Sequence, residues 1–171
     1  MFQHTLTTGM DTEKEPTYPK GALKFPKSER LSHATLISRL FEQGESVYAY
    51  PLRLTYRLAE VESVPAELLQ GRFQYMVNVP KKRFKRAVHR VRLRRLMREA
   101  WRQSRVPLRD RFLAEKPGMV LHMGVVYVGT DMAGFEKIVS KTGKLIAHLE
   151  NRLFASAAES KEQNRAEHEG D

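Results

Sequence analysis

The chain has 171 residues, which suits one domain with flanking segments, and it contains no cysteine. Disulfide frameworks, thiolate zinc sites and cysteine nucleophiles are therefore excluded. No apolar run reaches the ~18–20 residues of a membrane span and the N-terminus lacks the apolar stretch of a signal peptide, so we expect a cytoplasmic protein. The formal net charge of +10 indicates a polyanionic partner, either a nucleic acid or an anionic membrane surface.

The positive charge is concentrated in one segment. Residues 81–111 carry 14 lysines and arginines against two acids, whereas the other 140 residues carry 16 bases and 18 acids. Because like charges at this density repel one another, the segment is either a solvated face that the fold tolerates or a surface that meets a polyanion.

Both ends of the chain differ in composition from the middle. Residues 1–28 contain three prolines and no sustained periodicity, which predicts a flexible N-terminal arm. Residues 155–171 are acidic and have no large apolar side chain, which predicts a disordered tail. The folded domain is then expected over residues 29–154.

The sequence of the first half of this domain predicts one helix followed by two strands. Ser32 is a good N-cap for a helix with an apolar stripe that ends at Gly44. Residues 47–58 alternate as a half-buried strand, and residues 72–79 alternate again after a connector over 59–71. The face that the first strand is expected to share consists of Tyr48, Tyr50, Leu52, Leu54, Tyr56 and Leu58, with Arg53, Thr55 and Arg57 on the other.

The sequence of the second half predicts a helix, then a strand, then a second helix. A long helix is expected from about Arg86 to Ser104, where Pro107 stops it. Residues 118–128 are apolar on both faces, as in a central strand. Helical spacing returns from about Phe135 to Phe154. The mixed order of helices and strands predicts the α+β class, a sheet layer packed with helices.

The helix over 86–104 has two chemically different faces. At 100° per residue, the apolar arc consists of Leu93, Leu96, Met97, Ala100 and Trp101, and the opposite arc of Arg92, Arg94, Arg95, Arg98 and Arg102. A solvated face usually mixes Lys with Glu, but Glu99 is the only acid here. Guanidinium forks match phosphate, and the basic loop over 81–86 adjoins the helix N-terminus, which also favours anions. The pattern therefore favours a polyanion over a solvated face.

Several single residues keep two interpretations. Arg90 lies at the edge of the apolar arc, where it could snorkel along the core or reach a polyanion. Phe41, Phe84 and the strand tyrosines could pack in the core or stack on bases. We expect His89 and His122 to be structural, because neither histidine has a partner cluster at ligand spacing. Trp101 is expected to anchor the helix in the core.

The chain shows no sign of a catalytic site. It lacks a His-x-Glu motif, paired carboxylates in an apolar setting, a Ser/His/Asp set and a phosphate-cradling glycine loop. We therefore expect no catalytic residue and no metal ligand in the protein itself, so that any hydrolysis is supplied elsewhere.

The segment from Lys81 to Trp101 resembles the core motif of the bacterial ribonuclease P protein component. That family carries Lys-Lys, then Arg-Ala, then Arg-Asn-Arg, an apolar residue, Lys/Arg-Arg-Leu and Arg-Glu before an aromatic residue. This chain matches each part except the asparagine, which is Val91 here. The resemblance extends over about residues 25–154 and includes Arg30-Leu31 and a first helix that ends Phe41-x-x-Gly44.

The resemblance implies both a fold and a function. The fold would be a small two-layer α/β sandwich with one mixed sheet and a left-handed crossover, like the second domain of a small-subunit ribosomal protein. The chain would be the non-catalytic protein subunit of an endoribonuclease whose catalytic RNA, with bound Mg²⁺, removes the 5′ leader from precursor tRNA. Its partners would be that RNA and the leader, with no membrane and no obligate protein partner.

The resemblance also implies two sets of binding residues. Ile37 and Phe41 fall where the family has cleft residues for the leader, and Tyr48 and Tyr50 join them as candidates for base stacking. Val91 cannot form the hydrogen bonds of asparagine and should weaken one contact. The set expected to contact RNA is Lys81, Lys82, Lys85, Arg86, Arg90, Arg92, Arg94, Arg95, Arg98 and Arg102.

Three other functions compete with this interpretation. A ribosomal or RNA-chaperone protein of similar fold would bind RNA without a role in tRNA cleavage. A membrane-surface helix would need its apolar arc free for lipid. A protein-only nuclease would cleave RNA with a metal ion and without an RNA subunit.

Overall fold

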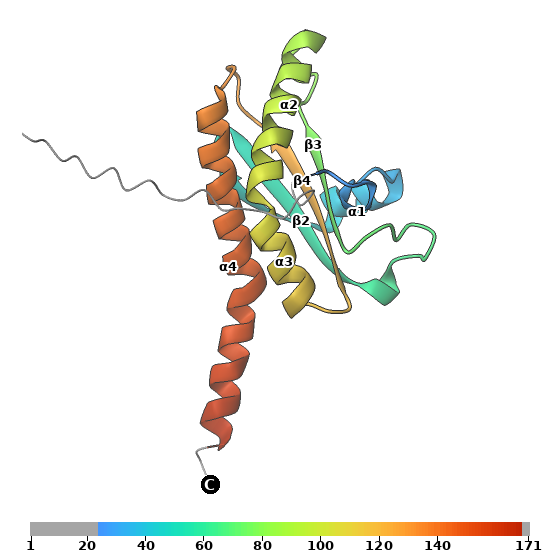
Figure 1. Ribbon diagram of the computed structural model, residues 1–171, viewed down its shortest axis with the longest axis vertical. Coiled ribbons are helices and arrows are strands. Elements are labelled where there is room, and N and C mark those ends of the chain that lie inside the picture. The colour runs from blue at the N-terminus through green and yellow to red at the C-terminus, as the bar shows by residue number, and fades with distance from the viewer. Residues whose placement is uncertain (1–23, 169–171) are drawn as a thin grey trace, which may run out of the picture.

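The computed structural model describes residues 24–168, which form a mixed four-stranded sheet with helices on both faces (Figure 1). The elements in chain order are a 3₁₀ turn η1 (Lys27–Glu29), α1 (Ala34–Gln43), β1 (Glu45–Ala49), β2 (Leu52–Glu60), a second 3₁₀ turn η2 (Val61–Ser63), β3 (Phe73–Asn78), α2 (Ala87–Ser104), α3 (Val106–Glu115), β4 (Met119–Tyr127) and α4 (Phe135–His168). The predicted α+β class is confirmed. No helix in the described part of the chain is both long and apolar enough to cross a membrane.

The sheet has the strand order β1-β2-β4-β3. The pairs β1/β2 and β2/β4 are antiparallel, whereas β3 and β4 are parallel and are joined by a crossover through α2 and α3. Residues 120–127 of β4 are all buried, which confirms the predicted central strand. The strands β1 and β3 form the two edges.

The two faces of the sheet are covered unequally. Met123 and Tyr127 of β4 belong to the main core beneath α2, α3 and α4, which includes Trp101. Val120, on the other face, belongs to a smaller cluster with Leu36 and Leu40 of α1. Helix α1 therefore lies opposite the other three helices and leaves part of its face of the sheet uncovered (Figure 1).

The prediction of one continuous strand over residues 47–58 is wrong, because this segment is a hairpin of two strands. Pro51 lies in the turn, where its peptide bond with Tyr50 is cis, and a proline cannot donate to the ladder of an uninterrupted strand. The six residues expected on one face are consequently separated. Leu52, Leu54 and Tyr56 are buried, whereas Tyr48, Tyr50 and Leu58 are exposed.

Pro107 was expected to end the long helix, but it begins another. Helix α2 does end at Ser104, and Pro107 lies in the first turn of α3, where its missing N–H costs no hydrogen bond. Arg105 joins the two helices in a right-handed helical conformation, with φ −76° and ψ −23°.

Helix α1 begins at Ala34, with His33 rather than the predicted Ser32 at the N-cap.

Both predicted flanking segments contain ordered residues. Phe25, within the segment expected to be a flexible arm, stacks on Tyr75 with ring centroids 4.4 Å apart. At the other end, α4 continues to His168, so residues 155–168 are helical instead of disordered. Residues 1–23 and 169–171 lie outside the described residues.

A row of polar side chains crosses the sheet on the face of α1, and two of them, His122 and Gln74, are buried while Arg57 is half-buried. Arg57, His122 and Gln74 are neighbours in register on three adjacent strands. His122 is 1% exposed, and neither ring nitrogen has a hydrogen-bond partner among the described residues. Burial, and then the charge of Arg57, lowers the pKa of His122 to about 4. The imidazole is therefore neutral at pH 7.

We expect His122 to make the stability of the protein fall with acidity. As the pH drops, the unfolded chain binds a proton near the ordinary pKa of 6.5 before the folded chain does near 4, so stability is lost between these values. Urea unfolding of the wild type should lose about 1–2 kcal/mol between pH 7.5 and pH 5 through this residue. His122→Gln should remove that part of the loss, whereas the exposed control His148→Gln should keep it. Equal pH dependence in wild type and His122→Gln would contradict the assignment.

Candidate nucleic-acid interface

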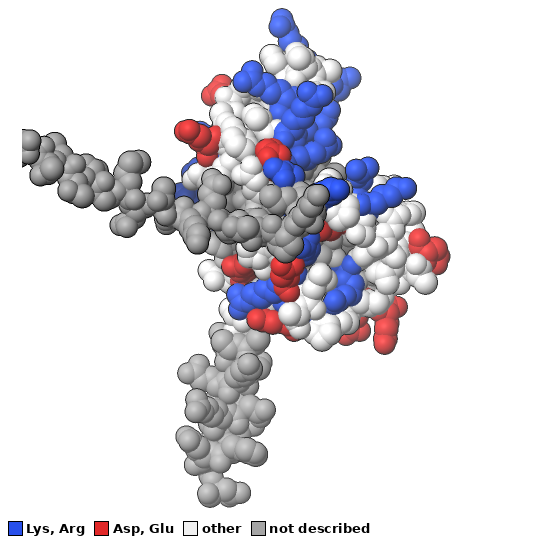
Figure 2. Space-filling view, viewed as in Figure 1, with Lys and Arg blue, Asp and Glu red and all other residues white. Residues whose placement is uncertain are grey.

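The basic loop before α2 is anchored by an aromatic side chain. Phe84 is 7% exposed and meets the ring of Tyr127 edge-on, with centroids 5.6 Å apart. Of its two possible roles, packing is the one that the structure shows. The basic side chains around it are exposed, and Figure 2 shows lysines and arginines gathered over this loop and α2. These exposed residues are Lys81, Lys82, Arg83, Lys85 and Arg86.

Arg90 holds this loop against the first turn of α2. Its Nη1 atom donates hydrogen bonds to the carbonyl oxygens of Phe84, at 2.7 Å, and Lys85, at 2.8 Å. This role differs from both snorkelling and free projection. The contact of Arg90 with RNA stays a prediction, and the structure shows that the residue also shapes the loop.

The arginine arc of α2 is exposed or half-buried along its whole length. Arg102 forms an ion pair with Glu99 at 2.5 Å, and the hydrogen bond between them raises the pKa of Arg102 and lowers the pKa of Glu99. The other four arginines of the arc form no ion pair among the described residues; they are Arg92, Arg94, Arg95 and Arg98. The uncompensated charge of the arc therefore lies on these four residues, beside the exposed Val91.

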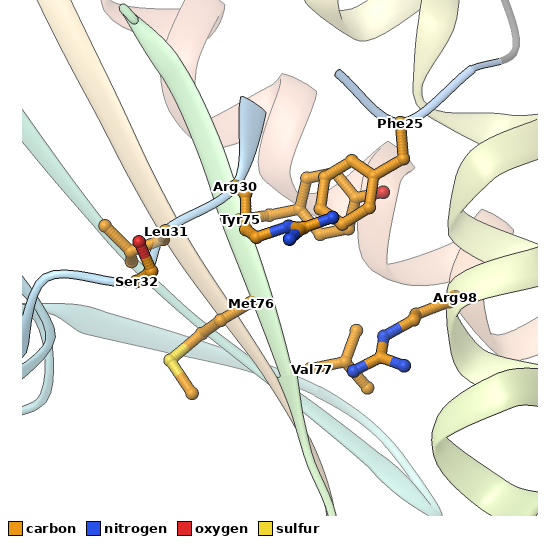
Figure 3. A pocket seen from close by; sticks show the side chains of 8 residues that line it. All are labelled: Phe25, Arg30, Leu31, Ser32, Tyr75, Met76, Val77 and Arg98. Carbon is orange, nitrogen blue, oxygen red and sulfur yellow. The ribbon is translucent and has the colours of Figure 1, made fainter. Parts of the chain in front are cut away.

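A pocket of about 420 Å³ lies between α2 and the outer edge of β3 (Figure 3). Arg98 enters it from α2, and Arg30 enters it from the segment before α1. The stacked rings of Phe25 and Tyr75 form one wall, with the Arg30 guanidinium 5.4 Å from the centroid of the Phe25 ring. Two guanidinium groups next to a stacked aromatic pair suit a nucleotide, with its phosphate on the cations and its base on a ring.

Sequence reasoning missed this pocket because its parts are far apart in the chain. Phe25 lies in the segment predicted to be a flexible arm, and the sequence singles out Arg30 only as part of the Arg30-Leu31 pair. Tyr75 was expected in a strand without a role in binding. The only signal in the sequence was Arg98, on the arginine arc.

The four predicted cleft residues do not all come together. Phe41 is 39% exposed and lies over Gly124, where a Cβ atom would be 2.9 Å from the Cζ atom of Phe41. Ile37 is half-buried one turn earlier on α1. Tyr48 is exposed on the same face of the sheet. Tyr50 lies instead at the tip of the hairpin, with its ring 6.0 Å from the Nζ atom of Lys137 on α4.

The structure adds Arg53 to the candidate binding residues on this face of the sheet. A row across the sheet consists of Tyr48, Arg53, Val126 and Asn78 in register. Arg53 was expected opposite Tyr48, because residues 48 and 53 of one continuous strand point to opposite faces. In a hairpin they pair across the strands and share a face.

The other candidate residues are structural. Tyr56 is buried, and its hydroxyl donates a hydrogen bond to Oε2 of Glu45 at 2.8 Å. Trp101 is 1% exposed against Tyr75, as expected for a core anchor. Across residues 24–168, no group of three or more His, Cys, Asp or Glu side chains is placed to hold a metal ion.

The chain matches known proteins over most of its length. The family model described as ribonuclease P matches residues 25–150. The ribonuclease P protein component of Porphyromonas gingivalis strain W83 is 30% identical over 131 residues, which cover 77% of this chain and 90% of that protein. The corresponding protein of Chlorobium phaeobacteroides is 32% identical over 130 residues, covering 72% and 86% respectively.

A solved structure gives a more distant match. The Staphylococcus aureus RNase P protein has a TM-score of 0.45 at 15% identity, covering 71% of this chain and 94% of that one. The family model alone covers well over half of the sequence and includes α2 and its basic loop. The chain therefore belongs to the ribonuclease P protein component family.

Proposed function

We propose that this chain assists a catalytic RNA in removing the 5′ leader from precursor tRNA, by binding both the RNA subunit and the leader. The observation that carries the proposal is the basic surface formed by the 81–86 loop and the arginine arc of α2, together with the two-arginine pocket beside β3. Family membership supports the choice of RNA as the polyanion.

The two sides of the domain suit two different binding roles, one for the RNA subunit and one for the leader. The arginine arc of α2 projects away from the core and suits the phosphate backbone of a folded RNA subunit. The partly uncovered face of the sheet carries exposed Phe41 and Tyr48 beside Arg53, which suits a single strand. The leader would lie on this face after the RNA subunit has docked on α2.

The chemistry would belong to the RNA subunit. Magnesium ions held mainly by that RNA would activate the attacking water, and the protein would act in the cytoplasm by neutralising phosphates and positioning the leader. Each neutralised phosphate releases counterions, so ~6–10 contacts would reduce affinity by ~10³–10⁵ between 50 and 200 mM salt. Such a protein should matter most when magnesium is scarce.

Reconstituted cleavage tests the proposal. The folded protein, added to the RNA subunit from the same organism, should stimulate cleavage of precursor tRNA at low magnesium. Absence of stimulation would reject the proposal, and ribosomal RNA binding without stimulation would support the chaperone alternative. Cleavage by the RNA-free protein with a metal ion would identify a protein-only nuclease.

The role of the sheet face is tested by removing its aromatic side chains. Phe41→Ala with Tyr48→Ala should weaken binding of precursor tRNA by at least about 30-fold, because two rings are removed and base–aromatic stacking contributes ~1–3 kcal/mol per base. Binding of mature tRNA, which lacks the leader, should be unchanged. Met132→Ala removes an exposed apolar side chain from the β4–α4 loop and serves as the control. Equal losses for precursor and mature tRNA would contradict a leader role.

A further inference from the structure

Helix α4 carries a second cationic surface, outside the arginine-rich segment. The α4 stripe consists of Lys137, Lys141, Lys144, His148 and Arg152, spaced three or four residues apart along one face. All are exposed except Lys141, which is half-buried. From Lys137 to Arg152 the stripe extends about 22 Å along the helix. Between Lys137 and Arg152, no acidic residue of α4 lies on this arc.

The charge of this stripe is largely uncompensated. Lys137, Lys141 and Lys144 form no ion pair within the described residues. Repulsion from Lys144, then desolvation, then Lys137, lowers the pKa of Lys141. Arg152 alone meets an acid, with 3.5 Å between its Nη1 and Oε2 of Glu45, and both side chains are more than half exposed. Such an exposed pair contributes little, so the stripe is free to meet an anion.

Exposed aromatic side chains lie beside the stripe. Helix α4 packs along β1, and a groove of about 440 Å³ between them is lined by Tyr48 together with His148 and Arg152. Tyr50, 59% exposed, lies next to Lys137 at the other end of the stripe. Cations that follow a groove and aromatic rings that face solvent are the two features by which proteins hold single-stranded nucleic acid.

The stripe continues the surface that we propose for the leader. Tyr48 belongs both to the row that crosses the sheet face and to the groove beside α4. At the opposite edge of the sheet, β3 lies beside Arg98 and the pocket on the arginine side of α2. A strand that starts at the docking side would thus cross the face of α1, pass the edge strand β1 and reach α4.

We infer that the α4 stripe, with Tyr48 and Tyr50, binds the leader nucleotides farthest from the cleavage site. This inference rests on the proposed function and adds the path that a long leader takes beyond the sheet face. The proximal nucleotides lie near α2 because the RNA subunit docks there, so only leaders long enough to pass β1 reach the lysines. The protein therefore distinguishes precursors by leader length.

The test is a triple substitution, Lys137→Ala, Lys141→Ala and Lys144→Ala, in the reconstituted holoenzyme with precursor tRNAs of graded leader length. Alanine preserves helix propensity, so α4 should remain folded. Affinity for the longest leaders should fall about 10–50-fold at 150 mM salt, and the salt slope should become shallower by about 2, as expected for three lost phosphate contacts. Affinity for leaders of only a few nucleotides should stay within about twofold. The matched variant with arginine at all three positions should bind long leaders like the wild type.

Three outcomes would overturn the inference. Unchanged affinity for long leaders would show that the lysines do not contact the leader. Equal losses for short and long leaders, or weaker binding of the RNA subunit without substrate, would show that the stripe meets the RNA subunit instead. Failure of the proposed function is distinguishable, because the wild-type protein would then not stimulate cleavage of any precursor.

Discussion

Replacing Arg94 and Arg98 by alanine should weaken binding of the RNA subunit by about 30-fold at 150 mM salt, if each arginine neutralises one phosphate. Both residues lie on the α2 flank away from the buried arc, and Arg98 also lines the pocket beside β3. The slope of the logarithm of affinity against the logarithm of salt concentration should become shallower by about 1.4–1.8. The free energy of unfolding should change by less than about 0.5 kcal/mol, since neither side chain is buried.

The measurement is a binding titration at several salt concentrations together with urea unfolding. Arg39→Ala with Arg111→Ala removes the same charge from other parts of the surface and serves as the control. The control pair should bind within about threefold of the wild type, as expected if position rather than net charge matters. Equal losses in both pairs would indicate a nonspecific charge effect. Loss of folding in the first pair would mean that the faces of α2 are wrongly assigned.

The faces of α2 could be predicted because they depend on local spacing alone. Leu93, Met97, Ala100 and Trp101 are all buried, as the helical period of the apolar residues requires. The central position of β4 was also predictable, because only a strand covered on both sides is apolar on both faces.

The hairpin was not predictable from periodicity, because alternation continued through the turn. Residues 47–58 keep a period of two on both sides of Pro51, so the pattern resembles one long strand. The proline was the available signal. The error changed the face assigned to Tyr48 and Arg53, and therefore the composition of the candidate cleft.

The α4 stripe was hidden by averaging charge along the chain. Outside residues 81–111 the net charge is slightly negative, since 18 acids outnumber 16 bases. Lysines spaced three or four residues apart on α4 nevertheless form a surface, because Glu136 and Glu150 lie on other faces of the helix. Charge per segment therefore located the arginine surface but not the lysine stripe.

The segment before α1 is held to the helices by a buried ion-pair cluster. Arg105 is 0% exposed, and its Nε atom donates to Oε2 of Glu29 at 2.5 Å. The same guanidinium donates to the carbonyl oxygens of Arg102 and Lys24, and Arg109 reaches Oε1 of Glu29 at 2.9 Å. The cluster thus fixes the segment that contributes Phe25 and Arg30 to the pocket beside β3.

Glu29→Ala should accordingly lower the free energy of unfolding by about 3–5 kcal/mol, because it leaves Arg105 as a buried charge without its anionic partner. Urea unfolding at pH 7 gives the value, and Glu62→Ala removes an exposed acid as the control. Adding Arg105→Met should recover part of the loss, since the isolated cation is then gone. RNA affinity should fall as well under conditions where the variant is folded, because Phe25 no longer holds Arg30 over the pocket. A cost below about 1 kcal/mol would indicate that water compensates Arg105 and that the cluster does not position this segment.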